Sequence, residues 1–205
     1  MFRARGFSLI ELVIVIAIIG LLAAIAFPSF QTWLRNLQIR NAAESLQNGL
    51  QLARMEALRR NDRVSFWAVS TANPRILDDS CMRSGNGGSW LVSRDDPAAA
   101  CGVDVSESAA PRIIQKKAAG DGAPDVLVDI TDVGGNAASC ATFNGFGRVE
   151  SACADAAANA PLARIVFSSA QADPNVRNLE VRLTLGGLIR MCDPAVLTAS
   201  DPRFC

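Results

Sequence analysis

The sequence lacks two residue types on which much enzyme chemistry depends. Among its 205 residues there is no histidine and no tyrosine. Without histidine, neither a Ser-His-Asp nor a Cys-His nucleophile system can form, and metal sites that need imidazole ligands are excluded. None of the glycine-containing stretches has the spacing of a phosphate-binding or dinucleotide-binding loop. We therefore expect no catalytic residue, no metal site and no cofactor, and we expect that the chain is not an enzyme.

The sequence also lacks net charge. It has 20 basic and 20 acidic side chains, so its formal charge is zero. A protein that binds nucleic acid through bulk electrostatics usually carries a large positive excess. Any anionic partner would therefore have to be held by a local group of basic side chains.

No pair of cysteines has C-x-x-C spacing, so neither a zinc ribbon nor a thioredoxin-type motif is expected. The chain has 6 cysteines, all beyond its apolar N-terminal segment, which favours structural disulfides formed in an oxidising compartment over free thiols. Short loops close more readily than long ones. Proximity in the sequence thus predicts the pairs Cys81–Cys101, Cys140–Cys153 and Cys192–Cys205.

The N-terminus joins a short basic stretch to a long apolar run. Two arginines precede residues 7–27, in which Ser8 and Glu11 are the polar residues. A helix of this length spans roughly 30 Å at about 1.5 Å per residue, enough to cross a bilayer. The alternative is an exported soluble enzyme with a cleaved signal peptide, because residues 24–26 resemble a cleavage site. The length of the run and the costly carboxylate of Glu11 argue against that alternative.

The residues around Glu11 carry a family resemblance. Gly6-Phe7-Ser8-Leu9-Ile10-Glu11, with a basic leader before it and the apolar run and Pro28 behind it, resembles the N-terminal signature of type IV prepilins and type II secretion pseudopilins. The resemblance implies that a prepilin peptidase cuts between Gly6 and Phe7 and methylates the new amino terminus. It also implies that Glu11 pairs with the Phe7 amine of a neighbouring subunit, since a buried carboxylate needs a positive partner. The alternative is a Glu11 that only reaches the membrane interface.

Beyond the apolar run, residues 28–60 continue as an amphipathic helix. Pro28 is expected to kink the helix, and Arg59 and Arg60, followed by Asn61 and Asp62, to end it. Apolar residues recur at three- and four-residue steps, at Phe30, Leu34, Leu37, Leu46, Leu50, Ala53 and Ala57.

From residue 64 the pattern changes to short alternating runs between turn-forming stretches, which predicts strands. The expected strands are Val64–Ser70, Trp90–Ser93, Ile113–Lys117, Val126–Thr131, Ala141–Phe146, Arg164–Ser168, Leu179–Leu185 and Leu188–Cys192.

These patterns predict an α+β protein. A long N-terminal helix, transmembrane and then amphipathic, packs on an antiparallel β-sheet head domain, in the pilin-like fold that the resemblance implies. We expect a leader peptide at 1–6, a transmembrane or filament-core helix at 7–27, its amphipathic continuation at 28–62 and a β-rich periplasmic head at 63–205. The protein is thus expected to cross the inner membrane once, or to stand in a pilus or pseudopilus.

The head resembles the GspH/FimT group of minor pilins. The resemblance implies a subunit that helps to assemble or prime a type IV pilus-like filament with other major and minor pilins or pseudopilins. The cysteine-closed tail favours the pilus branch, and a GspH-type subunit of the type II secretion system is the alternative. Trp90, Leu91, Phe143 and Phe146 are interpreted as core residues. The stretches that carry the resemblance are 51–57, 90–95, 143–148 and 185–194.

A further alternative is a subunit that binds DNA during uptake. In the uptake-linked members that this sequence resembles, a Gly-Arg-x-Arg turn precedes the cysteine, whereas residues 187–190 here are Gly-Leu-Ile-Arg. Arg190 is thus the retained candidate, and Arg182, Arg203 and the Lys116-Lys117 pair are additional ones. So few phosphate contacts predict weak binding. A solvated turn in which Arg190 pairs with an acidic neighbour would explain the same residues.

Overall fold

The N-terminal part of the described chain forms one long helix. The computed structural model describes residues 8–123, 125–155 and 158–205, so the expected leader lies outside the described residues. Helix α1 (Leu9–Arg60) is 52 residues long, and the Ser8 side chain caps it by accepting a hydrogen bond from the Glu11 amide. Asn61, with a left-handed φ of 48°, ends the helix at the stop that the sequence predicts.

The rest of the described chain alternates strands with turns. Eight strands lie where the alternating pattern predicts them, with small differences at their ends, and the two-residue β2 was not predicted. The strands are β1 (Val64–Ser70), β2 (Met82–Arg83), β3 (Ser89–Ser93), β4 (Ile113–Lys117), β5 (Val126–Thr131), β6 (Cys140–Phe143), β7 (Arg164–Ser169), β8 (Leu179–Leu183) and β9 (Ile189–Cys192).

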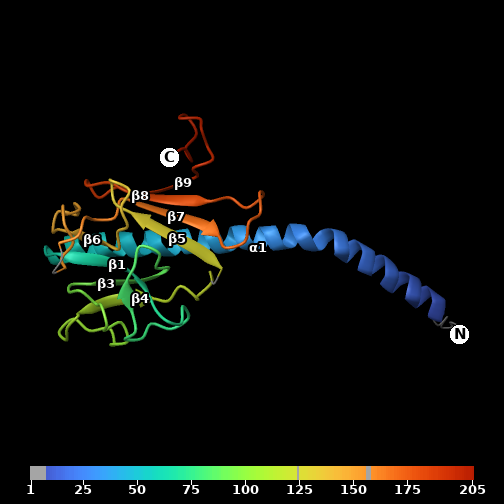
Figure 1. Ribbon diagram of the computed structural model, residues 1–205, viewed down its shortest axis with the longest axis horizontal. Helices are drawn as coiled ribbons and strands as arrows, with labels where there is room; N and C mark the ends of the chain where they lie inside the picture. Colours follow the sequence, from blue (N-terminus) through green and yellow to red (C-terminus); the bar gives the residue numbers. More distant parts are fainter. Residues whose placement is uncertain (1–7, 124, 156–157) are drawn as a thin grey trace, which may run out of the picture.

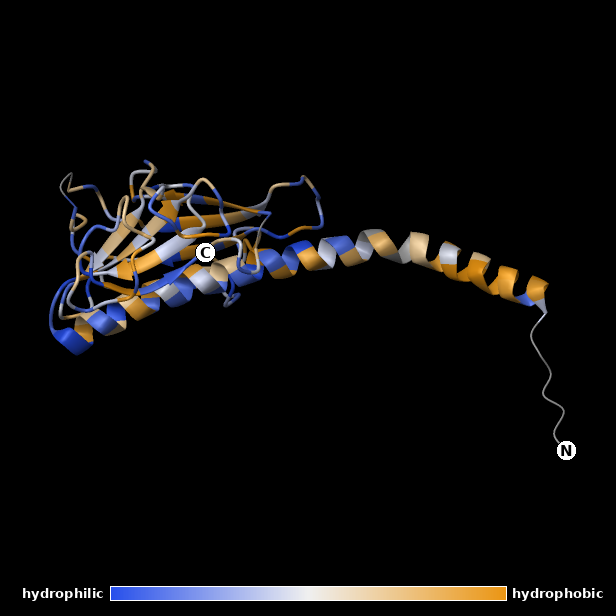
Figure 2. Ribbon diagram, turned by 90° about the horizontal axis from the view of Figure 1, so that it is seen from below, coloured by the Kyte–Doolittle hydropathy of each residue, from blue (hydrophilic) through white to orange (hydrophobic). Residues whose placement is uncertain are grey.

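The strands form two antiparallel sheets that lie on the same side of α1 (Figures 1 and 2). The five-stranded sheet has the order β2-β1-β3-β4, and β6 also pairs with β1. The four-stranded sheet has the order β5-β7-β8-β9. The predicted α+β class, a long helix packed on antiparallel sheet, is therefore confirmed.

Helix α1 contributes one buried stripe to a core that both sheets share. Phe66 and Phe143 of the five-stranded sheet and Ile165 and Phe167 of the four-stranded sheet belong to the same buried cluster. An amphipathic helix buries its apolar stripe by packing it against other elements. Here both sheets pack against the stripe of α1. The buried positions of the stripe are Ile39, Ala42, Ala43, Leu46, Leu50, Ala53 and Ala57.

The stripe begins later than the sequence pattern predicts. Phe30, Leu34 and Leu37 are 53%, 41% and 37% exposed, so they do not belong to the core of the head. The buried apolar stripe of α1 therefore begins only at Ile39, and the large apolar side chains of the amphipathic pattern before it remain exposed.

The close approach of α1 to the five-stranded sheet depends on Gly49. A Cβ atom at this position would lie 2.8 Å from a Phe66 ring carbon and 3.0 Å from the Trp90 ring. Phe66 and Trp90 stack with ring centroids 6.0 Å apart, and the Trp90 indole donates a hydrogen bond to the Ser45 hydroxyl at 2.9 Å. Glycine lowers the helix propensity at this position, and in return two aromatic rings fit against the helix.

A second buried cluster lies on the other face of the five-stranded sheet. Successive residues of a strand point to opposite faces, so Trp67 points away from α1 while Phe66 points toward it. Trp67 packs there with Leu91 and Ile113 and with four cysteines, Cys81, Cys101, Cys140 and Cys153. Both faces of β1 are therefore covered.

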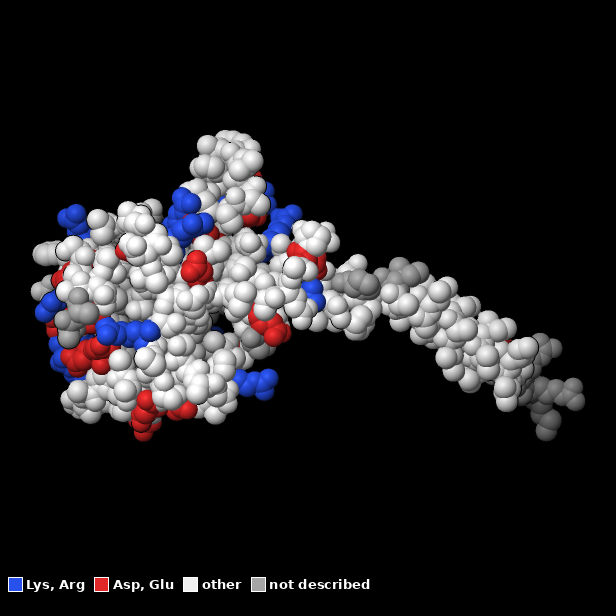
Figure 3. Space-filling model, viewed as in Figure 1, with Lys and Arg blue, Asp and Glu red and all other residues white. Residues whose placement is uncertain are grey.

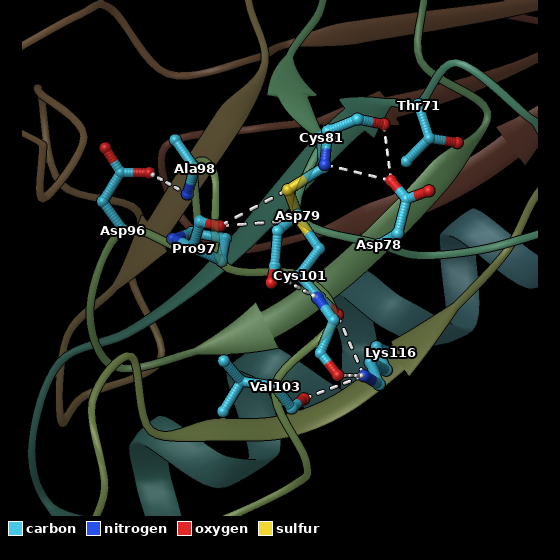
Figure 4. Close-up of a disulfide and its surroundings, with 12 residues drawn as sticks. Thr71, Asp78, Asp79, Cys81, Asp96, Pro97, Ala98, Cys101, Val103 and Lys116 are labelled. Carbon is cyan, nitrogen blue, oxygen red and sulfur yellow. Dashed lines mark hydrogen bonds between the residues drawn. A yellow bond between two sulfur atoms is a disulfide. The ribbon is translucent and has the colours of Figure 1, made fainter.

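Three disulfides close the irregular parts of the head. They join Cys81 to Cys101, Cys140 to Cys153 and Cys192 to Cys205, the pairs that sequence proximity predicts. In the chain-entropy model, loops of this length contribute roughly 3 kcal/mol each. Both sulfur atoms of the first pair lie 3.5 Å from the Pro97 carbonyl oxygen (Figure 4).

One of the four residues interpreted as core residues is not buried. Trp90, Leu91 and Phe143 are buried, but Phe146 is 82% exposed. It lies in a turn that Asn144 closes by accepting hydrogen bonds from the amides of Phe146 and Gly147. Gly147 has a φ of +71°, which favours glycine, so this residue serves the geometry of the turn.

Replacing Gly49 by leucine is expected to destabilise the head by about 2 kcal/mol or more, because the new side chain must displace the Phe66 or Trp90 ring. Urea unfolding of the full chain in neutral detergent, followed by tryptophan fluorescence, measures the effect. Asn48→Leu is the matched control, since Asn48 is exposed in the same turn. Equal stability of the two variants would contradict the packing described for Gly49.

Candidate functional site

The N-terminal half of α1 projects from the head with its apolar side chains uncovered (Figure 2). An apolar helix that is exposed all round is not stable in water and needs lipid or other apolar helices around it. The large apolar side chains that are about half or more exposed here are Leu9, Ile10, Leu12, Val13, Ile14, Val15, Ile16, Ile18, Ile19, Leu21, Leu22 and Phe27.

Within the described part of the chain, no single helix is long and apolar enough to cross a membrane by itself. The segments Leu9–Ala24 and Ser29–Arg60, which meet at a bend of 44°, would do so together by length and composition. Pro28 lies in the break between them, where the sequence predicts a kink.

Glu11 lies in the first turn of this exposed helix. Its amide donates to the Ser8 side-chain oxygen at 3.3 Å, and its own side chain is exposed. A carboxylate near a helix N-terminus is favoured by the helix dipole. No ion pair to Glu11 is found among the residues that the structure describes, and Gly6 and Phe7 lie outside them.

A loop between β7 and β8 fastens α1 at the point where the helix enters the head. Asp173 of this loop accepts hydrogen bonds from the Thr32 hydroxyl at 2.7 Å and from Arg35 at 3.3 Å. The hydrogen bond from Thr32, with others from Asn175 and the charge of Arg35, lowers the pKa of Asp173. In the next turn, Asn36 accepts a hydrogen bond from the Arg177 amide.

Two of the arginines predicted to contact DNA hold the C-terminal loop in place. Arg182 and Arg190 face each other on β8 and β9. The Arg182 guanidinium donates to the Cys205 carbonyl oxygen at 2.6 Å. Arg190 donates to the carbonyl oxygens of Pro202 and Phe204 at 3.0 and 2.6 Å. Both side chains therefore bind the main chain of the loop that the Cys192–Cys205 disulfide closes.

A buried carboxylate organises this group of arginines. The side chain of Glu180 is 0% exposed and pairs with Arg164 at 2.9 Å and with Arg182 at 2.5 Å. Burial acts to raise the pKa of Glu180, but hydrogen bonds from Arg164 and Arg182 outweigh burial and lower it. A Glu180 carboxylate oxygen lies within 4.8 Å of the sulfurs of Cys192 and Cys205. Those sulfurs are bonded to each other, so they do not offer thiolate ligands to a metal.

Two of the remaining cationic candidates, Arg203 and Lys116, are also engaged. Arg203 donates to Asp201 at 3.1 and 2.8 Å, and this hydrogen bonding lowers the pKa of Asp201 to about 2. Lys116 lies on β4 in the other sheet, where its ammonium donates to the carbonyls of Cys101, Gly102 and Val103 (Figure 4). The structure therefore does not unite the predicted cations into one patch.

A hollow of about 410 Å³ lies between α1, the edge strand β9 and the C-terminal loop. We call it the arginine hollow. Arg40 and Arg177, which line it beside Arg203, were not singled out from the sequence. Arg40 belongs to the polar side of an amphipathic helix and Arg177 to a loop, so neither stands in a motif that could reveal it. The lining residues are Asn36, Arg40, Arg177, Leu179, Met191, Cys192, Asp193 and Arg203.

Replacing Glu180 by glutamine is expected to lower the stability of the head by about 1–2 kcal/mol at neutral pH, because the buried carboxylate loses its ion pairs with Arg164 and Arg182. Since the folded pKa of Glu180 is lowered, its carboxylate stabilises the fold above its ordinary pKa of 4.5, and that contribution is lost as the pH falls through the lower folded value. The gap between wild type and variant should therefore narrow below pH 4.5.

Urea unfolding of the full chain at a series of pH values measures this gap. Asp201→Asn, which breaks a pair whose arginine is 59% exposed, is the control and should have a much smaller effect. A gap of constant size from neutral to acid pH would show that Glu180 acts through packing and not through its charge.

Comparison with known proteins places these features in a family. The sequence model of the family described as type II transport protein GspH matches residues 42–187. The model described as a prokaryotic N-terminal methylation motif matches residues 1–27. A crystal structure of the type IV minor pilin FimU of Pseudomonas aeruginosa aligns with 75% of this chain and 87% of its own, with 18% identity and a TM-score of 0.43.

Curated relatives are fimbrial proteins. A fimbrial protein of Moraxella nonliquefaciens is 36% identical over 99 residues, which are 48% of this chain. A fimbrial protein of Pseudomonas aeruginosa is 34% identical over 98 residues, or 45% of this chain. The chain spans 60% of the length of each of these two relatives. Because the GspH match covers well over half of the chain and the methylation motif covers its N-terminus, the protein belongs to the GspH family of type IV pilin-like proteins, as a minor pilin or pseudopilin.

Proposed function

We propose that this protein is a FimT-like minor pilin that helps to assemble or prime a type IV pilus-like filament. The observation that carries the proposal is the uncovered apolar half of α1 on the same chain as a folded, disulfide-closed head. Family membership implies assembly with other pilins or pseudopilins, and their apolar helices are the cover that this half requires. Before assembly, the same half lies in the inner membrane, crosses it once and leaves the head in the periplasm.

The pilus is proposed in preference to the type II secretion apparatus for two reasons. The curated relatives are fimbrial proteins, and a disulfide closes the C-terminal loop, as the sequence suggested for the pilus branch. The description of the matching family is type II transport protein GspH. A pseudopilin of the type II secretion apparatus is therefore the alternative. The two machines use the same kind of anchor, and α1 suits either of them.

At the N-terminus we propose the residue roles that the resemblance implies. A prepilin peptidase cuts between Gly6 and Phe7 and methylates Phe7. Glu11 then pairs with the Phe7 amine of a neighbouring subunit. Glu11 suits this role because its carboxylate is exposed in the first helical turn and has no partner within the described part of the chain.

DNA binding stays a prediction of the sequence. Arg182 and Arg190 bind the main chain of the C-terminal loop, and Arg203 pairs with Asp201. These contacts provide no support for a phosphate-binding role, because they direct donors of each guanidinium to groups of the protein itself.

The mature protein is expected to begin at methylated Phe7. Intact-mass measurement of the protein extracted from membranes of its host identifies the terminus. In Gly6→Leu the peptidase has no small residue before the cut, so the uncut precursor should accumulate. A mature terminus near Phe27 would contradict both the anchor and the family role proposed for it.

Glu11→Val is expected to leave membrane insertion intact and to prevent incorporation into filaments, because a costly charge is removed and the neighbouring amine loses its partner. Immunoblots of membranes and of sheared filaments measure the two steps separately. Glu11→Asp, which keeps a carboxylate in the same turn, is the matched control and should retain part of the assembly. Normal incorporation of the valine variant would overturn the proposed role of Glu11.

A further inference from the structure

The arginine hollow has a mixed lining that suits one class of ligand. Its cationic side comes from Arg40 on α1, Arg177 before β8 and Arg203 in the C-terminal loop, while Leu179 and Met191 are apolar. Figure 3 shows basic side chains beside the base of the C-terminal loop, over the region where α1 leaves the head. The hollow thus offers planar charge-assisted donors beside an apolar surface, which is the pair of features that a carboxylate on a short aliphatic stem requires.

The cations of the hollow are available to different degrees. Arg40 pairs with Glu44 at 2.7 Å, but the two side chains are 68% and 47% exposed, and such pairs contribute little. Arg203 keeps its bond to Asp201. The Arg177 guanidinium has neither a hydrogen bond nor an ion pair within the described part of the chain. Arg177 is therefore the residue with the most capacity for a new anionic partner.

The carboxylates around the hollow limit how much negative charge it can accept. Asp193 lines it and is 6% exposed, with its side chain accepting from the Ala195 amide at 2.9 Å. Together with Glu44 and Asp201, it balances the three arginines. A polyanion would be repelled by these groups, whereas a single carboxylate that binds Arg177 would not need to approach them.

The hollow is continuous with the part of α1 that another subunit must cover. Trp33 and Leu37, which are 55% and 37% exposed, each lie three residues before a lining residue, Asn36 and Arg40 respectively, so they share its side of the helix. A subunit that packs along the exposed helix therefore reaches the edge of the hollow. Packing along α1 would thus position a segment of the second subunit next to the hollow.

We propose that the arginine hollow binds an acidic side chain of another pilin-like subunit, with Arg177 as its main anchor. This inference rests on the proposed function, because it assigns the partner to the assembly. A duplex is less suited, since its backbone is a convex polyanion and the hollow is concave with acids at its rim. The hollow thus acts as a second point of contact beyond the apolar helix.

The chemistry of the hollow can be tested without a known partner. Isothermal titration calorimetry of the full chain in neutral detergent with a blocked alanine-glutamate-alanine peptide, which carries a single carboxylate, should show binding that weakens as salt is added. Arg177→Gln should weaken it by about tenfold or more. Arg75→Gln is the matched control, because Arg75 is also exposed but does not line the hollow. The matched peptide with glutamine in place of glutamate, which lacks the carboxylate, should not bind.

The role in assembly is tested in the host. Arg177→Glu should lower incorporation into sheared filaments, and Arg75→Glu should not. If the peptide does not bind, if binding survives Arg177→Gln, or if Arg177→Glu assembles normally while Glu11→Val fails, the inference about the hollow is wrong and the proposed function stands. Normal assembly of Glu11→Val would instead count against the proposed function. Tighter Arg177-dependent binding of duplex DNA or pyrophosphate than of the acidic peptide would overturn the choice of a protein partner.

Discussion

The constraint on which the rest of the structure depends is that one helix must satisfy two environments. From Ile39 onward α1 contributes its apolar stripe to a core that the two sheets share. Before that residue its large apolar side chains are exposed. The head cannot fold without the second half of the helix, and the first half cannot remain in water. Folding and assembly are therefore coupled through a single element, and the position of the head relative to any partner is set by where the buried stripe begins.

Most of the charged groups discussed above form ion pairs or hydrogen bonds that hold segments of the head together. Asp173 holds α1 through Thr32 and Arg35, and Glu180 holds Arg164 and Arg182 behind the C-terminal loop. Arg190 binds the carbonyls of that loop directly. Each arginine engaged in this way has fewer donors left for a ligand. A count of arginines near the C-terminus therefore overstates the cationic surface that is available there to a ligand. Arg177, which belongs to no motif, has more capacity for an anionic partner than Arg190.

Sequence patterns predicted the elements better than they predicted their surroundings. Alternation located eight strands, and the cap at Asn61 located the helix end, because both signals are local. The exposure of Phe146 and Leu37 and the contacts of Arg182 depend on chain segments far away in the sequence, which no local pattern contains. The disulfides are the exception, since three non-local contacts were predicted correctly because each pair is close in the sequence. The N-terminal signature identifies a family by motif, and its residue roles at Gly6 and Phe7 lie outside the described residues.

The fastening of the C-terminal loop has a consequence for binding. A loop held by a disulfide, by Arg182 and by Arg190 keeps its shape before any partner arrives, so the wall that it gives to the arginine hollow is already in place. Binding to a preformed wall avoids the entropy cost of ordering it, and a few contacts can then have a measurable effect. A weak contact of this kind is useful in an assembly where the apolar helix supplies most of the free energy. The helix brings the subunits together with little directional preference, and a fixed, charged hollow beside the helix exit can select how they are oriented.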